Sequence, residues 1–254
     1  MSIHPIILHI PHDSIVIPPE ERQKILLNDE ELAKELIFIT DSHTDELYQF
    51  DTAERVVFPV SRLLLDPERF SDDSQEPMAA RGMGVIYTIT SQLGQLREQP
   101  TEEERQDLLD TYYHPHHETL TRKTDEAVEA FDKCLIVDCH SFPSKTLPYE
   151  MKDGTESRPE ICIGTDSFHT PPEIKVLLEE FFKDAGYGVD IDTPFAGALT
   201  PLKHYAKDSR VMSVMYEIRR DLYMDEVTGE KNDNFAKVQS DITQSIALLK
   251  DKLF

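Results

Sequence analysis

The sequence predicts an α/β fold: a mostly parallel, mixed sheet in a three-layer arrangement with helices on both faces. Short apolar runs alternate with longer helical patterns along the 254 residues, which is typical of strands joined by crossover helices. No linker-like stretch divides the chain, so we expect residues 1–254 to form a single domain. At this length, with 39% hydrophobic residues, the chain can bury one sizeable core.

Strands are expected where apolar residues run without helical spacing. The segments are 6–10, 56–60, 85–89, 134–137 and 211–218, and residues 63–65 either continue the second strand or begin a new one.

Helices are expected where apolar residues recur at spacings of three and four. Residues 19–36 and 235–253 show this spacing. Residues 172–185 have Pro172 at the start and Gly186 just past the end, which is typical of a helix. A further helical stretch starts with a capping box, Thr101 with Glu104, and runs toward residue 131, where Pro115 should kink or divide it. The polar segment 144–159 is predicted to be a surface loop or lid.

The charge balance excludes several partners. With 26 Lys and Arg against 49 Asp and Glu, the net charge is −23, which disfavours nucleic acid and anionic membrane surfaces. No run approaches the ~18 apolar residues of a membrane helix, and the first residues lack the features of a signal peptide. The three cysteines form no CxxC motif, so we expect a cytoplasmic protein with reduced thiols.

Histidines and a glutamate stand at the ends of predicted strands. His12 follows the first strand, His140 follows strand 134–137, and Glu217 lies near the end of strand 211–218. Ligands of open α/β sheets bind outside the carboxyl ends of the strands, so these side chains are expected to converge. Two histidines and a carboxylate make a catalytic zinc site with an open position for water, and a further carboxylate can act as general base.

An acidic residue from the segment 41–46 would complete the ligand set, and the spacing of His43 and Glu46 is itself a weak metal-ligand motif. The alternative is that each histidine is an ordinary hydrogen-bonded loop residue.

Arginines are the second indication of a site, because cations are scarce in this chain. Arg62 and Arg69 flank Asp66, Arg81 precedes a Gly-Met-Gly segment, and Arg219 and Arg220 follow Glu217. Such arginines can bind a carboxylate with two hydrogen bonds. For Arg81 and Arg220, salt bridges to nearby acids are at least as favoured. We predict that Arg62, Arg69 and Arg219 line one positive cleft on an acidic surface.

The chain carries no motif for the common alternatives. It has no G-x-S-x-G nucleophile elbow, no Walker A motif and no GxGxxG motif, and Cys139 next to His140 is better placed for packing than for catalysis.

Six short motifs occur in a specific order. They are Pro11-His12-Asp13-Ser14, Asp41-x-His43-Thr44-Asp45-Glu46-Leu47, Ser61-Arg62-x-x-x-Asp66-x-x-Arg69, Tyr113-His114-Pro115-His116-His117, Asp138-x-His140-Ser141 and Glu217-Ile218-Arg219-Arg220-x-Leu222-Tyr223-Met224-Asp225-Glu226. As an ordered set, they resemble the N-formylglutamate amidohydrolase family over nearly the whole chain.

The resemblance implies a phosphorylase/hydrolase-like fold related to zinc carboxypeptidases. It implies hydrolysis of N-formyl-L-glutamate to L-glutamate and formate, as in histidine degradation, with a divalent metal, expected to be zinc, as cofactor. Glu217 matches the general base, and His140 would contribute to catalysis as well as to metal binding. The metal ligands implied are His12, Asp41 and His140, with His43, Asp45 and Glu46 as alternates for the third position. The substrate-binding residues implied are Arg62, Arg69, Arg219, His117 and Tyr223.

The chain departs from the family pattern at three places. Asp13-Ser14 replaces a small residue and Gly, Glu68 stands where Asn is frequent, and His116 stands where Tyr is common. The open alternatives are a different N-acyl amino acid or cell-wall amide as substrate, and a non-catalytic carboxylate-binding protein without a metal. A small-molecule substrate is the expected partner, and the sequence leaves the oligomeric state open.

Overall fold

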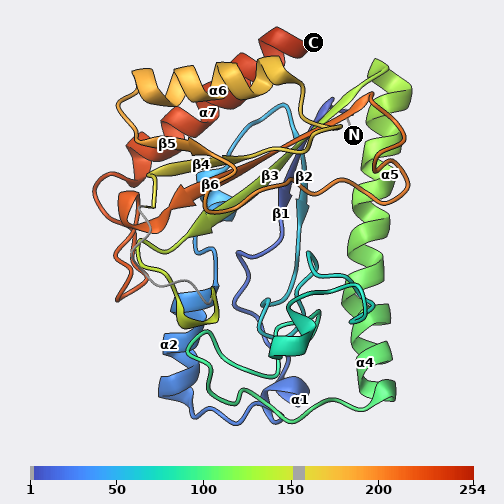
Figure 1. The fold of residues 1–254 in the computed structure, drawn as a ribbon, viewed down its shortest axis with the longest axis vertical. Helices are drawn as coiled ribbons and strands as arrows, with labels where there is room; N and C mark the ends of the chain where they lie inside the picture. The colour runs from blue at the N-terminus through green and yellow to red at the C-terminus, as the bar shows by residue number, and fades with distance from the viewer. Residues whose placement is uncertain (1–2, 151–157) are drawn as a thin grey trace.

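The computed structural model describes residues 3–150 and 158–254 and contains a six-stranded sheet with the order β2-β1-β3-β6-β4-β5 (Figure 1). Its strands are β1 (Ile6–Ile10), β2 (Glu54–Val57), β3 (Cys134–Phe142), β4 (Ile161–Gly164), β5 (Val189–Ile191) and β6 (Val211–Arg219). Strands β2, β1, β3 and β6 are mutually parallel, whereas β4 pairs with β6 in the antiparallel direction. The prediction of a mostly parallel, mixed sheet is therefore confirmed.

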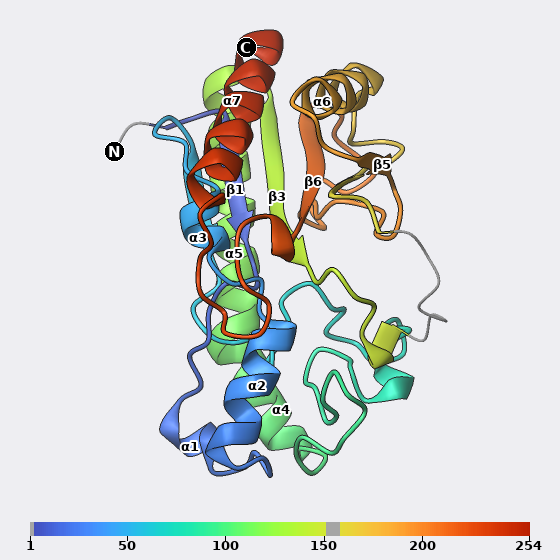
Figure 2. The same cartoon turned by 90° about the vertical axis from the view of Figure 1, so that its left-hand side faces the viewer.

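Helices cover both faces of the sheet (Figures 1 and 2). On one face, the even-numbered residues of β1 and β6 and the odd-numbered residues of β3 join a core with α6 (Pro172–Asp184) and α7 (Phe235–Leu253). On the other face, Ile7, Cys134, Ile136 and Val211 pack against α5 (His114–Phe131). Because successive side chains of a strand point to opposite faces, this alternation also decides which polar residues share a face.

The segment predicted as one helix over 19–36 forms two helices, α1 (Pro19–Arg22) and α2 (Asp29–Ile39). The side chain of Asn28 accepts a hydrogen bond from the Glu31 backbone, and the Glu31 side chain accepts one from the Asn28 backbone. This capping box starts a new helix after a non-helical stretch. A short helix, α3 (Thr44–Leu47), follows α2.

The predicted division of the helical stretch after Thr101 is confirmed. Thr101 and Glu104 form the capping box of α4 (Glu102–Leu108), a π-type segment covers Leu109–Tyr113, and α5 begins with Pro115 in its first turn. A proline is tolerated there because the first amides of a helix have no intrahelical partner.

Other predicted elements differ in detail. The strand expected at 85–89 makes only the isolated bridges Met83 to Tyr87 and Ile89 to Gln95, and residues 63–65 form no strand, because a turn covers 62–64. Two short strands, β4 and β5, have no counterpart among the predicted elements. Of the loop or lid expected at 144–159, residues 151–157 lie outside the described residues, and Pro148–Glu150 forms one turn of 3-10 helix.

Cys134, Cys139 and Cys162 are free and buried. Within residues 3–150 and 158–254, no helix has the length and apolarity needed to cross a membrane.

Candidate active site

The sheet places its polar side chains at the carboxyl ends of three neighbouring strands, on the face covered by α5. Asp138 and His140 in β3 and Glu217 in β6 belong to the set that points away from the α6 and α7 core, and His140 and Glu217 are directly paired in register. His12 follows the end of β1 two residues later. His12, His140 and Glu217 line one pocket of about 420 Å³, whereas Asp138 lies behind His140 and does not line it.

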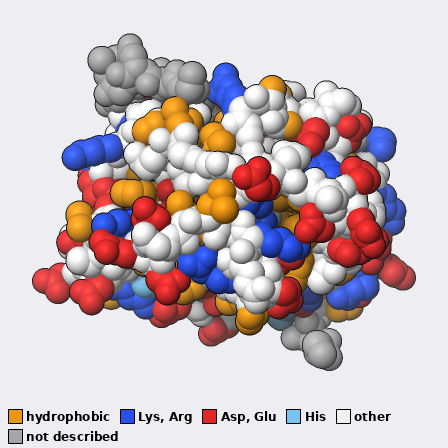
Figure 3. All heavy atoms as spheres, turned by 90° about the horizontal axis from the view of Figure 1, so that it is seen from below, with side chains coloured by type: hydrophobic (Ala, Val, Ile, Leu, Met, Phe, Trp, Pro, Cys, Tyr) orange, Lys and Arg blue, Asp and Glu red, His pale blue; other side chains and the backbone are white. Residues whose placement is uncertain are grey.

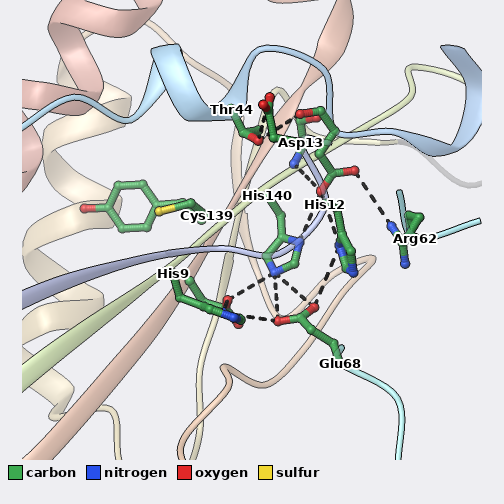
Figure 4. Close-up of polar contacts among 12 residues, drawn as sticks. His9, His12, Asp13, Thr44, Arg62, Glu68, Cys139 and His140 are labelled. Carbon is green, nitrogen blue, oxygen red and sulfur yellow. Dashed lines mark hydrogen bonds and ion pairs between the residues drawn. The ribbon is translucent and has the colours of Figure 1, made fainter. Parts of the chain in front are cut away.

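The two histidines lie side by side, with ring centroids 5.1 Å apart, and each is held by carboxylates (Figure 4). His12 Nε2 lies 2.9 Å from Asp66 Oδ1. His140 Nε2 lies 3.2 Å from Asp138 Oδ1 and 3.2 Å from Glu68 Oε2. The Nδ1 atom of His12 is buried and has no hydrogen-bond partner.

Asp41 stands between the Nδ1 atoms of both histidines. Its backbone amide bonds to the His12 carbonyl just after α2, and its Oδ2 lies 3.2 Å from His140 Nδ1 and 3.7 Å from His12 Nδ1. Its Oδ1 accepts a 2.8 Å hydrogen bond from Arg220. Burial opposes the charged form, but the close approach of His12 and His140 and the charge of Arg220 hold the pKa of Asp41 well below its usual range. The site therefore contains a buried, ionised carboxylate aimed at two ring nitrogens.

Glu68 and Asp66 were not singled out as site residues by the sequence. Glu68 lies within reach of both histidines, and the ligand atoms of His12, Glu68 and His140 all lie within 4.8 Å of one another. Both residues lie between Arg62 and Arg69 in the third motif, and this position is the sequence feature that could have identified them. A departure from the family pattern, Glu68, is thus part of the site itself.

Glu217 is buried beside His140, and its Oε2 has no hydrogen-bond partner. Burial raises the pKa of Glu217 to about 8; the neighbouring His140 lowers it, and Asp41 raises it. A carboxyl group whose pKa lies near the working pH can both take up and release a proton.

Four arginines line the pocket, and they do not include all three that were expected. Arg62 and Arg69 line it, together with Arg81 and Arg220. Arg219 lies outside it, and its side chain bonds to Asp221 and to the carbonyl of Arg158. The reason is local: the strand ends at Arg219, and a 3-10 turn over Arg220–Leu222 directs Arg220 back toward Asp41.

Two further residues expected to bind substrate lie elsewhere. His117 bonds through Nε2 to the carbonyl of Pro67 and is not among the residues lining the pocket. Tyr223 is fully buried and donates to the carbonyl of Ser42, so it packs the loop that carries Asp41.

The alternates for the third metal ligand point away from the histidine pair. His43 bonds to the carbonyl of Gly229, Asp45 pairs with Arg55, and Glu46 pairs with Lys231. Of the acidic residues in the segment 41–46, the structure therefore brings Asp41 alone to His12 and His140 among the described residues.

On the end of the molecule seen from below in Figure 3, acidic and basic side chains are intermixed, with acidic clusters at the left and right margins. The predicted positive cleft of Arg62, Arg69 and Arg219 is not formed: Arg219 lies outside the pocket, and the four arginines that line it are accompanied by Asp41, Asp66, Glu68, Glu150 and Glu217.

Comparisons with known proteins agree with this architecture. The chain superposes with a TM-score of 0.85 on a structure described as N-formylglutamate amidohydrolase from Ralstonia eutropha JMP134, at 22% identity, covering 100% of this chain and 95% of that one. A gene product from Agrobacterium tumefaciens superposes with a TM-score of 0.69 at 20% identity, covering 97% and 92% of the two chains. At these identities the likeness shows the fold.

No curated protein matches the sequence. Residues 4–224, however, match the family described as N-formylglutamate amidohydrolase. Since that match spans most of the 254 residues, the chain belongs to the N-formylglutamate amidohydrolase family, whose members hydrolyse amide bonds.

Proposed function

We propose that this protein is a zinc-dependent enzyme that hydrolyses N-formyl-L-glutamate to L-glutamate and formate, a cytoplasmic step of histidine degradation. The observation that carries the proposal is the convergence of His12 Nδ1 and His140 Nδ1 on one carboxylate, Asp41, in a pocket that also contains Glu217 and four arginines.

The donor atoms fit a divalent metal. Zinc binds nitrogen and oxygen ligands at roughly 2.0–2.2 Å, which places tetrahedral ligands about 3.4 Å apart. The Oδ2 atom of Asp41 lies 3.2 and 3.7 Å from the two Nδ1 atoms, and His12 Nδ1 has no other partner. Each histidine also faces a carboxylate through Nε2, as metal-binding histidines usually do. Glu68 is the alternate third ligand.

When bound, such a metal would polarise the amide carbonyl and lower the pKa of a water molecule. The protein's own contribution to proton transfer is Glu217. Its unpartnered Oε2 can accept the proton of the attacking water and return it to the leaving nitrogen.

Arg62 and Arg69 are the side chains that we assign to the substrate carboxylates. The Nε atoms of both are buried without a hydrogen-bond partner, so each guanidinium has bonds left to make. Arg220 differs because its bonds already go to Phe38, Asp41 and Ser141. We therefore assign Arg220 to holding Asp41 in place.

The test combines metal analysis of the purified protein with formate release from N-formyl-L-glutamate and from a panel of other N-acyl amino acids. Glu217→Gln should lower kcat by about 10²–10⁴-fold, because the general base is lost while the shape of the side chain is retained. Its zinc content should equal that of the unmodified protein.

Undiminished turnover in Glu217→Gln would reject the role of Glu217. Absence of bound metal with intact ligand binding would support a non-catalytic carboxylate-binding protein, and preference for another acyl group would reject N-formyl-L-glutamate as the substrate.

A further inference from the structure

Behind His140, a row of buried polar side chains runs from α5 through β1 to β3. His116 Nε2 lies 2.8 Å from His9 Nε2, His9 Nδ1 lies 2.7 Å from Asp138 Oδ1, and Asp138 Oδ1 lies 3.2 Å from His140 Nε2. His9 and His116 have no part in the proposed reaction.

The partners restrict where the protons lie. Carboxylate oxygens only accept hydrogen bonds, so His9 Nδ1 donates to Asp138. His140 Nε2 lies 3.2 Å from the same Asp138 oxygen and 3.3 Å from Glu68 Oε1, to which it hydrogen-bonds. Burial lowers the pKa of His116 to about 2, which keeps its ring neutral with one proton. Between the two Nε2 atoms, one ring therefore donates and the other accepts.

Packing restricts movement in this row. His9 is fully buried, and His116 is 5% exposed. The ring of Phe58 stands edge-on to His116 with centroids 5.0 Å apart. The backbone amide of Leu199 holds the other oxygen of Asp138 at 2.9 Å. These contacts favour one arrangement of the row, since breaking one of its hydrogen bonds leaves a buried polar group unpaired.

We propose that His9 and His116 are positioning residues that hold Asp138 against His140 Nε2 and so keep His140 Nδ1 turned toward Asp41 and His12. This inference rests on the proposed function, because it assigns the two residues to the support of a metal ligand. Outer-shell partners of this kind typically change metal affinity by roughly 10- to 100-fold.

A second cation bound by His9, Glu68 and Asp138 is the competing interpretation, because their ligand atoms also lie within 4.8 Å of one another. The hydrogen bonds favour the positioning role, since no buried side-chain N or O atom of His9, His116 or Asp138 lacks a partner without an ion. Metal stoichiometry separates the two interpretations.

The experiment measures zinc affinity, by competition with a chromophoric chelator, in the full-length protein and in four variants. These are His9→Leu, His116→Leu, His116→Gln, whose amide can still donate to His9, and His114→Leu as a control. His114 lies on the same helix with an exposed side chain whose nearest carboxylate partner is Asp110.

We expect one zinc per chain in the unmodified protein. His9→Leu should weaken zinc binding by roughly 10- to 100-fold, in the range measured for outer-shell partners, and His116→Leu should weaken it by a smaller factor. His116→Gln should recover most of the loss, and His114→Leu should bind as the unmodified protein does. With zinc in excess, kcat should fall in the same order while KM stays constant.

Unchanged affinity in both leucine variants, with only a lower Tm, would show a merely structural role and overturn the inference. Two zinc ions per chain, falling to one in His9→Leu, would overturn it in favour of the second cation site. If His9→Leu does not fold, the two His116 variants carry the test. Affinity is read without substrate, so a failure of the inference leaves formate release intact, whereas an unmodified protein that binds no zinc overturns both proposals.

Discussion

The two sides of His140 differ in how completely their polar atoms are paired. On the pocket side, defined by His12, Glu217, Arg62 and Arg69, each residue has one buried side-chain nitrogen or oxygen without a partner. On the inner side, defined by His9, His116 and Asp138, no buried side-chain atom lacks one. Both sides are built from histidines and carboxylates, so composition alone does not separate them.

The difference indicates that the two sides of His140 have different roles. Unpaired buried polar groups are rare in proteins because they cost free energy, and several of them around one pocket mark a place where something binds. A network whose buried polar atoms are all hydrogen-bonded avoids that loss of free energy and keeps its side chains in one arrangement. The pocket side is thus suited to ligands, and the inner side to holding the pocket side in shape.

The largest expected effect distinguishes the two carboxylates that could complete the metal site. Asp41→Asn should weaken zinc binding by more than the roughly 100-fold upper range for an outer-shell partner, because it removes a charged ligand. Glu68→Gln should stay within that range. Chelator competition measures both, and circular dichroism checks the fold. Loss of zinc from Glu68→Gln with retention in Asp41→Asn would move the ligand role to Glu68.

An intermediate effect tests which arginines serve the pocket. Arg69→Lys should raise KM for N-formyl-L-glutamate by about tenfold with little change in kcat, because a lysine cannot form the paired hydrogen bonds of a guanidinium. Arg219→Ala is the control, because the Arg219 side chain hydrogen-bonds to Asp221 outside the pocket. The KM of this variant should change less than about twofold. Steady-state kinetics gives both values; an equal rise in the two variants would contradict the assignment.

The smallest effect concerns stability rather than activity. Burial lowers the pKa of His117 to about 4, below the ordinary histidine value of 6.5. The unfolded chain binds this proton more tightly than the folded chain does. The contribution of His117 to the free energy of unfolding should therefore be complete above pH 6.5 and should be lost as the pH falls toward 4. This histidine contributes at most about 1.4 kcal/mol per pH unit.

Urea unfolding at several pH values measures that slope. His117→Gln should flatten it between pH 6.5 and 4, whereas His114→Gln should leave it unchanged; equal slopes in all three proteins would show that His117 is not the group responsible. His117 lies outside the pocket, so its substitution should alter stability more than zinc affinity.

Sequence patterns predicted the long elements and the strand-end residues well. The strand 134–137 and the spacing of 235–253 correspond to β3 and α7, and the capping box at Thr101 starts α4. Short or irregular elements escaped prediction: β4 and β5 have four and three residues, too few for a periodic pattern. The apolar segment 85–89 resembles a strand, yet it packs in a hydrophobic cluster outside the sheet and forms no hydrogen-bonded pair with a strand of the sheet.

For the site, the choice between neighbours could not be made from the sequence. Arg219 and Arg220 are adjacent, and only the turn that begins at Arg220 decides which one reaches Asp41. Likewise, the sequence favoured Asp41 but left His43, Asp45 and Glu46 as alternates, and the end of α2 places Asp41 against the histidines.

The sequence by itself determined the α/β class, the strand ends that carry His12, His140 and Glu217, and the family, because hydrophobic periodicity and ordered motifs are local properties of the chain. The tertiary structure alone decided that Glu68 joins the histidines, that His116 reaches across to His9, and which nitrogen of each ring faces which carboxylate. Those contacts join residues up to 107 positions apart, and ring orientation depends on packing from several elements at once.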